Sequence, residues 1–246
     1  MGQKLSKYAL LFFVIISRFC FSQDEGVKPP VISEYKGDTS YTNFNNLRFD
    51  VARAQINLLK RGALLVRLRT NAGTISKLKK AGNIDLATQV ERETQLKNKA
   101  IMRTYRQEFN FCSVYFFNSD CSDSVKNKHL ENIFVDSNLV VDPTIVCKAN
   151  FYLIAEQGSI YNSSLGIVRE SLAKEAVERG TIFRDVFIVI KNRYFIQVHK
   201  PFPYFQKGLI EKNNRAYMKD FNERLQEFYL KNSSFVLNPE LKEYVY

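Results

Sequence analysis

The chain has 246 residues, of which 45% are hydrophobic and 25% charged, and a formal net charge of +11 at pH 7. This composition predicts a globular protein of one or two domains, and the absence of Trp excludes a tryptophan platform for sugars. Only two His residues are present, and no His-Glu-x-x-His, paired-cysteine or Gly-x-Ser-x-Gly motif occurs. We therefore expect no metal, no cofactor and a non-enzymatic role.

The first 22 residues have the pattern of a cleavable export signal. Lys4 and Lys7 precede an apolar run at 8–17, and small residues, Cys20 and Ser22, stand where a signal peptidase cleaves. This run is about half the length of a membrane-crossing helix, so we expect cleavage after Ser22 rather than a retained anchor. A charge and a large aromatic directly before Cys20 argue against lipid attachment there. We predict an exported protein, in the periplasm or at the outer-membrane periphery of a Gram-negative bacterium, with no transmembrane span when mature.

After an extended linker at 23–43, the basic character is concentrated in one segment. Residues 44–107 contain 14 Lys or Arg against four Asp or Glu. Apolar residues in this segment recur at alternating steps of four and three, which predicts the seam of a long helix. These positions are Leu47, Val51, Ala54, Leu58, Leu65, Leu68, Ala72 and Ile75. Gly82-Asn83 then predicts a helix stop and a new start, so that 44–108 would form a basic, coiled-coil-like helical hairpin.

A cationic hairpin suggests a surface for an anionic partner, such as lipid headgroups, lipopolysaccharide phosphates or another envelope protein. The candidate binding residues are Lys60, Arg61, Arg67, Arg69, Lys77, Lys79 and Lys80. The alternative is a solvated helical face, because Lys and Arg are good helix formers. Nucleic acid is not expected as a partner, since no recognised binding motif is present.

Residues 109–232 predict a second, mixed α/β domain, followed by a tail at 233–246. The expected strands lie at 111–117, 132–136, 151–155, 183–190 and 194–198, and the expected helices at 122–130, 168–179 and 213–231. The last two strands predict a β-hairpin with a tight turn at Asn192. The fold class that follows for the whole chain is α+β or α/β, with a C-terminal helix.

The element order of 110–231 resembles the thioredoxin-like fold, in which a central sheet ends with an antiparallel pair and a closing helix. That resemblance would place a redox site just after the first strand, with Cys121 as the attacking thiol and Ser124 in the place of the second cysteine. The sequence departs from the pattern, because Asp120 and Asp123 would raise the thiol pKa and no proline precedes Phe183. A thiol redox or thiol-capture protein using Cys121 is therefore an alternative function.

Cleavage of the signal would leave three cysteines, Cys112, Cys121 and Cys147, an odd number in a compartment where disulfides persist. At most one internal bridge could then form. Cys112 and Cys121 are candidates for it, and the alternative is that Cys112 and Cys147 are small buried apolar residues.

Three stretches together resemble an uncharacterised family of exported proteins of Bacteroidota over nearly the full length. They are RAQINLLKRGALLVRLRTNAGTISKLKKAGN, NFCSVYFFNSD and KPFPYF. The resemblance implies a location and no activity. The leading hypothesis is a non-enzymatic binding or interaction protein of the cell envelope, with the thiol protein and a peripheral binder of anionic membrane surfaces as the alternatives.

Overall fold

The computed structural model describes residues 44–161, 183–208, 214–241 and 245, all of which belong to one compact unit, Val31–Tyr246. The expected signal peptide, the linker at 23–43 and the expected helix at 168–179 lie outside the described residues. Within the described part of the chain, no helix combines the length and the apolar character needed to cross a membrane.

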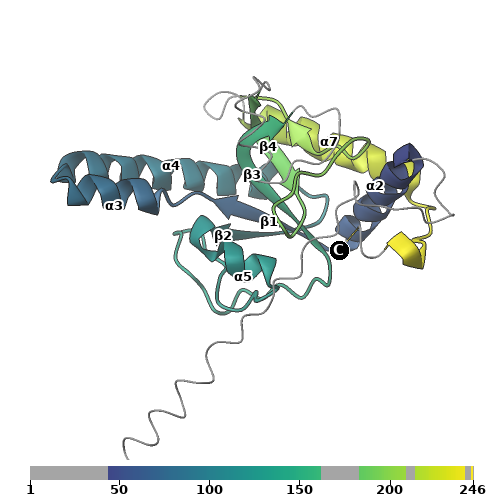
Figure 1. Cartoon of the computed structure of the whole chain (residues 1–246), viewed down its shortest axis with the longest axis horizontal. Coiled ribbons are helices and arrows are strands. Elements are labelled where there is room, and N and C mark those ends of the chain that lie inside the picture. Colours follow the sequence, from purple (N-terminus) through teal and green to yellow (C-terminus); the bar gives the residue numbers. More distant parts are fainter. Residues whose placement is uncertain (1–43, 162–182, 209–213, 242–244, 246) are drawn as a thin grey trace, which may run out of the picture. The chain divides into compact units, whose positions relative to one another are not determined.

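The fold is mixed α/β, as the sequence predicts, and it is organised around one five-stranded sheet with the order β2-β1-β3-β4-β5. The strands are β1 (Ala63–Leu68), β2 (Ser113–Asn118), β3 (Tyr152–Tyr161), β4 (Phe183–Lys191) and β5 (Phe205–Gln206). β1 pairs in parallel with both β2 and β3, whereas β4 is antiparallel to β3 and to β5 (Figure 1). The carboxyl ends of β1, β2 and β3 therefore meet at one edge of the sheet.

Helices cover the sheet unequally. The helices are α2 (Phe44–Arg61), α3 (Ala72–Lys80), α4 (Ile84–Glu108), α5 (Ser122–Lys126) and α7 (Asn214–Asn232). Side chains of α2, α4 and α7 share one buried cluster with Leu64, Val66 and Leu68 of β1. Ala63 and Leu65 point to the opposite face, where they pack with Val125 of α5. β1 is thus buried on both faces, which explains why its sequence, ALLVRL, is almost continuously apolar.

The predicted long first helix of the hairpin is wrong. α2 ends at Arg61 and 63–68 form a strand, because Gly62 brings the chain against β3. A Cβ atom at Gly62 would stand only 2.3 Å from the carbonyl oxygen of Phe151, and the Ala63 N–H donates to that same oxygen at 3.1 Å. The predicted domain boundary at 108/109 is also wrong, since β1 from the first segment lies between β2 and β3 of the second.

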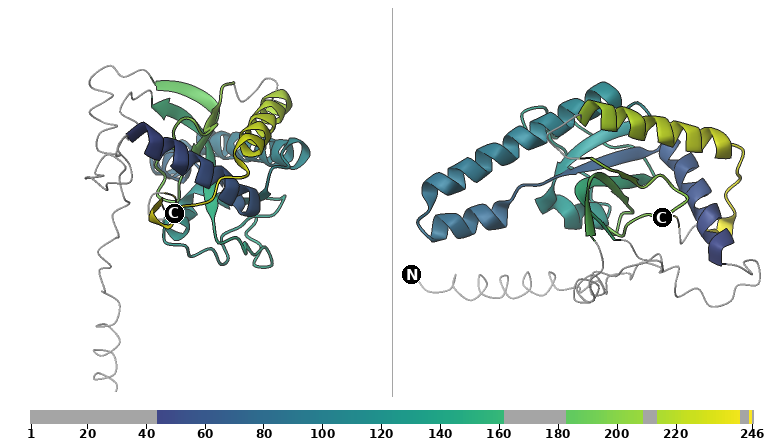
Figure 2. Two further views of the ribbon diagram at one scale, coloured as in Figure 1. Left: turned by 90° about the vertical axis from the view of Figure 1, so that its right-hand side faces the viewer. Right: turned by 90° about the horizontal axis from the view of Figure 1, so that it is seen from above.

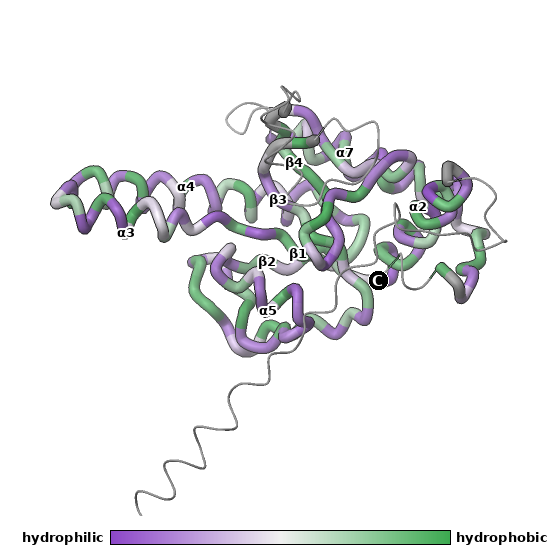
Figure 3. The backbone as a smooth tube through the Cα atoms, in the orientation of Figure 1, coloured by the Kyte–Doolittle hydropathy of each residue, from purple (hydrophilic) through white to green (hydrophobic). Residues whose placement is uncertain are grey.

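The helix stop at Gly82-Asn83 is confirmed, with α3 ending at Lys80 and α4 beginning at Ile84. Gly82 has a φ of 78°, a left-handed conformation that favours glycine. α3 and the first half of α4 lie side by side and project away from the sheet (Figures 1 and 2). We call residues 72–98 the arm. No residue of α3 is buried, and hydrophilic and hydrophobic residues alternate along the tube of the arm (Figure 3).

In the second half of the chain, the expected C-terminal helix and the strand at 183–190 are confirmed as α7 and β4. The tight turn at Asn192 is confirmed, with an antiparallel bridge between Lys191 and Gln197, but 194–198 do not form the full second strand of the predicted β-hairpin. The Asn192 carboxamide oxygen instead accepts hydrogen bonds from the backbone N–H groups of Tyr194 and Ile196. This local turn reverses the chain, and Val198 donates its backbone N–H to the carbonyl oxygen of Ile190 at 3.0 Å.

Candidate functional site

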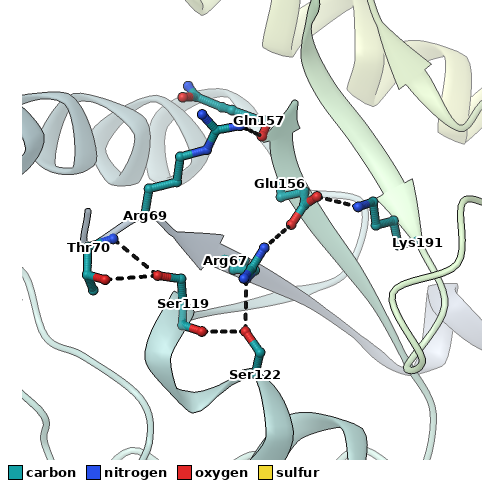
Figure 4. A network of polar contacts seen from close by, with 8 residues as sticks. All are labelled: Arg67, Arg69, Thr70, Ser119, Ser122, Glu156, Gln157 and Lys191. Carbon is teal, nitrogen blue, oxygen red and sulfur yellow. Dashed lines mark hydrogen bonds and ion pairs between the residues drawn. The ribbon is translucent and has the colours of Figure 1, made fainter. Parts of the chain in front are cut away.

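The segment directly after β1 joins the ends of three strands to the arm. A guanidinium N–H of Arg69 donates to the carbonyl oxygen of Gln157 at 2.8 Å, at the carboxyl side of β3. Thr70 donates its backbone N–H to the Ser119 hydroxyl at 3.2 Å, after β2 (Figure 4). The Thr70 hydroxyl donates to the carboxylate of the next residue, Asp120, at 2.8 Å. In open α/β sheets this edge, outside the carboxyl ends of parallel strands, is where ligands bind.

The same segment holds α4 by two buried polar side chains. The Asn98 side chain donates to the carbonyl oxygen of Arg69 at 2.8 Å, and Asn71 donates to the Thr94 hydroxyl at 2.7 Å. Thr94 and Asn98 are four positions apart, so they lie on one face of α4. Asn71 has a φ of 52°, a conformation that Asn tolerates better than most residues. The direction of the arm is thus set by specific hydrogen bonds.

Between α3, α4 and this edge of the sheet lies a cavity of about 720 Å³, which we call the arm groove. Its lining has three cations (Arg69, Lys79, Lys80), one carboxylate (Glu91), six neutral polar residues (Thr70, Ser76, Thr94, Gln95, Asn98, Asn118) and three apolar ones (Ala72, Ile75, Leu139). The volume falls within the range of small-ligand sites. The composition is cationic and rich in hydrogen-bonding groups.

Charge in the arm groove is only weakly compensated. Lys79 Nζ lies 3.8 Å from Glu91 Oε2, with both side chains about half exposed, and ion pairs of this kind contribute little. The lining therefore keeps an excess of positive charge from Arg69 and Lys80. A concave surface lined by one sign of charge raises the local concentration of oppositely charged ligands.

An ion-pair network with no residue in the groove lining lies on the α5 side of the sheet. The Glu156 carboxylate lies 2.8 Å from Arg67 Nη1 and 2.5 Å from Lys191 Nζ (Figure 4). Burial raises the pKa of Glu156, but Lys191 and Arg67 outweigh burial, so that its pKa lies below the usual value. Arg67 also donates to the Ser122 hydroxyl at 2.9 Å. The network ties together β1, β3, β4 and α5.

The structure separates the seven cations that the sequence proposed as one binding surface. Arg69, Lys79 and Lys80 come together in the arm groove. Arg67 belongs to the ion-pair network, and Lys60 donates to the carbonyl oxygen of Phe111 at 2.9 Å with its ammonium 4.7 Å from the ring of that residue. Arg61 is exposed at the end of α2, next to Lys60, and Lys77 is on α3 outside the groove lining.

Sequence reasoning missed the neutral polar residues of the groove. Thr94 and Asn98 are buried on the inward face of α4, in line with the apolar Ala87, Ile101 and Tyr105. A polar pair at a spacing of four within an otherwise apolar stripe is a signal that the sequence contained. Asn118 and Leu139 reach the groove from distant parts of the chain and had no comparable signal.

The three cysteines within the described residues, Cys112, Cys121 and Cys147, are all free. The predicted Cys112–Cys121 bridge is wrong, because Cys112 packs against the cluster on one face of the sheet and Cys121 against the cluster on the other. Burial raises the pKa of the Cys112 thiol to about 12. Burial and the nearby Asp120 raise that of Cys121.

The structure also changes which residues follow the first strand, the position at which the thioredoxin-like resemblance implies a redox site. β1, and not 111–117, is the first strand of the described sheet, so the position after the first strand falls on Arg69, Thr70 and Asn71. No cysteine stands there. Cys121 and Ser124 instead flank the start of the five-residue α5, after an edge strand. Neither the position nor the thiol pKa values favour thiol chemistry.

Among the residues that the structure describes, no group of three or more His, Cys, Asp or Glu side chains could hold a metal ion. His129 is exposed, whereas burial and then the charge of Arg48 lower the pKa of His199 to about 4. Comparison of the chain with models of known families, with curated proteins and with solved structures finds no match. The geometry of the arm groove is therefore the main guide to function.

Proposed function

We propose that this protein is a non-enzymatic binding protein of the cell envelope that holds an anionic ligand in the arm groove. The observation that carries the proposal is the lining of that groove, in which Arg69, Lys79 and Lys80 face a single carboxylate, Glu91. Cations that also donate hydrogen bonds are the groups that recognise carboxylates and phosphates.

The root of the groove supports this proposal because it is held in place without a ligand. Arg69 is fixed through its side chain by Gln157 and through its carbonyl oxygen by Asn98. A guanidinium has five N–H donors, so the bond to Gln157 leaves capacity for a ligand oxygen. Such pre-organisation favours binding, because less conformational entropy is lost when the ligand arrives.

Binding of inorganic tripolyphosphate, measured by titration calorimetry on the mature protein, tests the proposal. We expect Arg69→Ala and Lys80→Ala each to weaken binding by about tenfold, the effect of losing one charge-assisted hydrogen bond. Arg103→Ala and Lys99→Ala are the matched controls, since both residues are exposed on α4 and neither lines the groove. Equal losses in the controls and the groove variants would mean non-specific attraction to a basic surface, which contradicts the proposal.

The envelope location is part of the proposal and is supported by the signal-like pattern of the first 22 residues. Sequencing the amino terminus of the native protein from cell fractions tests it. We expect Gln23 as the first residue, in the envelope fraction. Recovery from the cytosol with Met1 still in place would contradict the location and leave the groove untouched.

A second candidate is contact between the tip of the arm and an anionic membrane surface. Ile84 and Leu86 are 54% and 48% exposed at the start of α4, and Lys77 is exposed nearby on α3. Exposed apolar residues beside cations are typical of interfacial binding. Co-sedimentation with phosphatidylglycerol vesicles should fall in the double variant Ile84→Ser/Leu86→Ser and not in Leu96→Ser, which changes a residue 59% exposed farther along α4. Equal binding to phosphatidylcholine vesicles would contradict this candidate.

A further inference from the structure

The cations of the arm groove stand at its two ends. Arg69 lies at the root, directly after β1, whereas Lys79 and Lys80 are the last two residues of α3. At 1.5 Å per residue, the rise from Ala72 to Lys80 separates the two ends by roughly 12 Å. A ligand of only a few atoms is shorter than this backbone separation.

The stretch between the two ends has no cation among the residues that line the groove. α3 contributes Ala72, Ile75 and Ser76 there. An anionic group placed against this stretch would lose water without gaining a charged partner, which is unfavourable. The middle of the groove therefore suits an apolar or neutral part of a ligand.

The two ends also differ in rigidity. At the root, Arg69 is held by Gln157, and the neutral polar residues Thr70 and Asn98 are held by hydrogen bonds of their own. At the outer end, Lys79 and Lys80 belong to a helix with no buried residue, and Lys79 lies 3.8 Å from Glu91. A fixed guanidinium selects a planar anion by geometry, whereas a flexible ammonium acts as a point charge. We expect the root to provide most of the specificity.

From these observations, and resting on the proposed function, we infer that the ligand is an elongated dianion. It carries a carboxylate or phosphate at each end of an apolar or neutral chain of roughly 12 Å, the separation set by the rise of α3. One anionic end binds at Arg69 in the root of the groove. The other contacts Lys80, and the chain between them lies along Ile75 and Leu139.

A length series of straight-chain dicarboxylates tests this inference by titration calorimetry on the mature protein. The probes are butanedioate, hexanedioate and decanedioate, with decanoate as the matched ligand that has the long chain but one carboxylate. We expect decanedioate to bind at least about tenfold more tightly than butanedioate and than decanoate, because only decanedioate reaches both ends. Arg69→Ala and Lys80→Ala should each reduce decanedioate binding to the level of decanoate, and Lys99→Ala should not.

The outcomes distinguish failure of the elongated dianion from failure of the proposed anion-binding function. If decanoate binds as tightly as decanedioate, the gain is hydrophobic and the elongated dianion is overturned. If butanedioate binds as tightly as decanedioate and binding still depends on Arg69, the groove is a compact anion site and only the further inference fails. If neither the dicarboxylates nor tripolyphosphate binds, the proposed function fails with it. Thermal melts of each variant monitor whether the fold is retained.

Discussion

The sheet and the arm are stabilised in different ways. In the sheet, Leu65, Phe117 and Ile154 have no exposed surface, and apolar burial on both faces holds the strands together. In the arm, α3 buries nothing, and the main anchors are the hydrogen bonds of Asn71 and Asn98 to and from neighbouring elements. Changes in the sheet should therefore affect folding, whereas changes in the arm should affect binding in a folded protein.

The test with the largest expected effect compares one residue of the sheet with one residue of the arm. Phe117 is fully buried in β2, so Phe117→Ala should lower the free energy of unfolding by about 4 kcal/mol, through lost burial and the cavity left behind. Leu96 on the arm is 59% exposed, and Leu96→Ala should cost less than about 0.5 kcal/mol. Denaturant unfolding measures both. Similar losses at the two positions would show that the arm is part of the folding core.

Acid should destabilise the sheet region through His199. Burial and the charge of Arg48 lower its pKa from the usual 6.5 to about 4, so the unfolded chain binds this proton more readily than the folded one. The stability due to neutral His199 is complete above about pH 6.5 and is lost as the pH falls towards 4, by up to about 3 kcal/mol. Unfolding curves across this range should show the loss in the wild type and in His129→Gln, where the changed residue is exposed. If His199→Gln shows an unchanged pH dependence, His199 is not the group responsible.

Replacing either of two glycines by Ala should have the smallest effect on stability, and the two effects should have opposite signs. Gly62→Ala places a Cβ atom 2.3 Å from the carbonyl oxygen of Phe151, the residue directly before β3, and should cost about 2 kcal/mol. Gly73→Ala on the arm meets nothing within 4 Å and should stabilise α3 by up to about 1 kcal/mol. Melting temperatures of the two variants check the signs. A destabilised Gly73→Ala would mean that α3 has a packing partner.

The sequence predicted helices correctly where the spacing of apolar residues fits only a helix. It failed where the same spacing also fits a buried strand. Leu47, Val51 and Ala54 follow a helical period, and they lie in α2. Leu65 and Leu68 continue the same spacing, yet they belong to a strand buried on both faces. A short apolar run does not distinguish a buried strand from a helix, and burial on two faces arises only from tertiary structure. Gly62 marked the change, but its meaning depends on the distant Phe151.

The candidate site was predictable in its charge and not in its shape. The basic count in 44–107 identified Arg69, Lys79 and Lys80, which share one groove. It could not separate them from Lys60, whose ammonium is bound by Phe111. Which cations meet depends on the break between α2 and β1, because that break turns the chain so that Lys60 and Arg69 stand at opposite ends of a strand. Asn118 and Leu139 join the groove only after β2 pairs with β1.

The missing side chain at Gly62 has an effect far from its own position. It allows the Phe151 carbonyl oxygen to approach, which aligns the start of β3 with the start of β1, Ala63 opposite Tyr152. Because paired strands share one register along their length, this alignment also places the Gln157 carbonyl oxygen within reach of Arg69, roughly 20 Å farther on. The absence of one methyl group at Gly62 thus contributes to the placement of the Arg69 guanidinium at the far end of the strand.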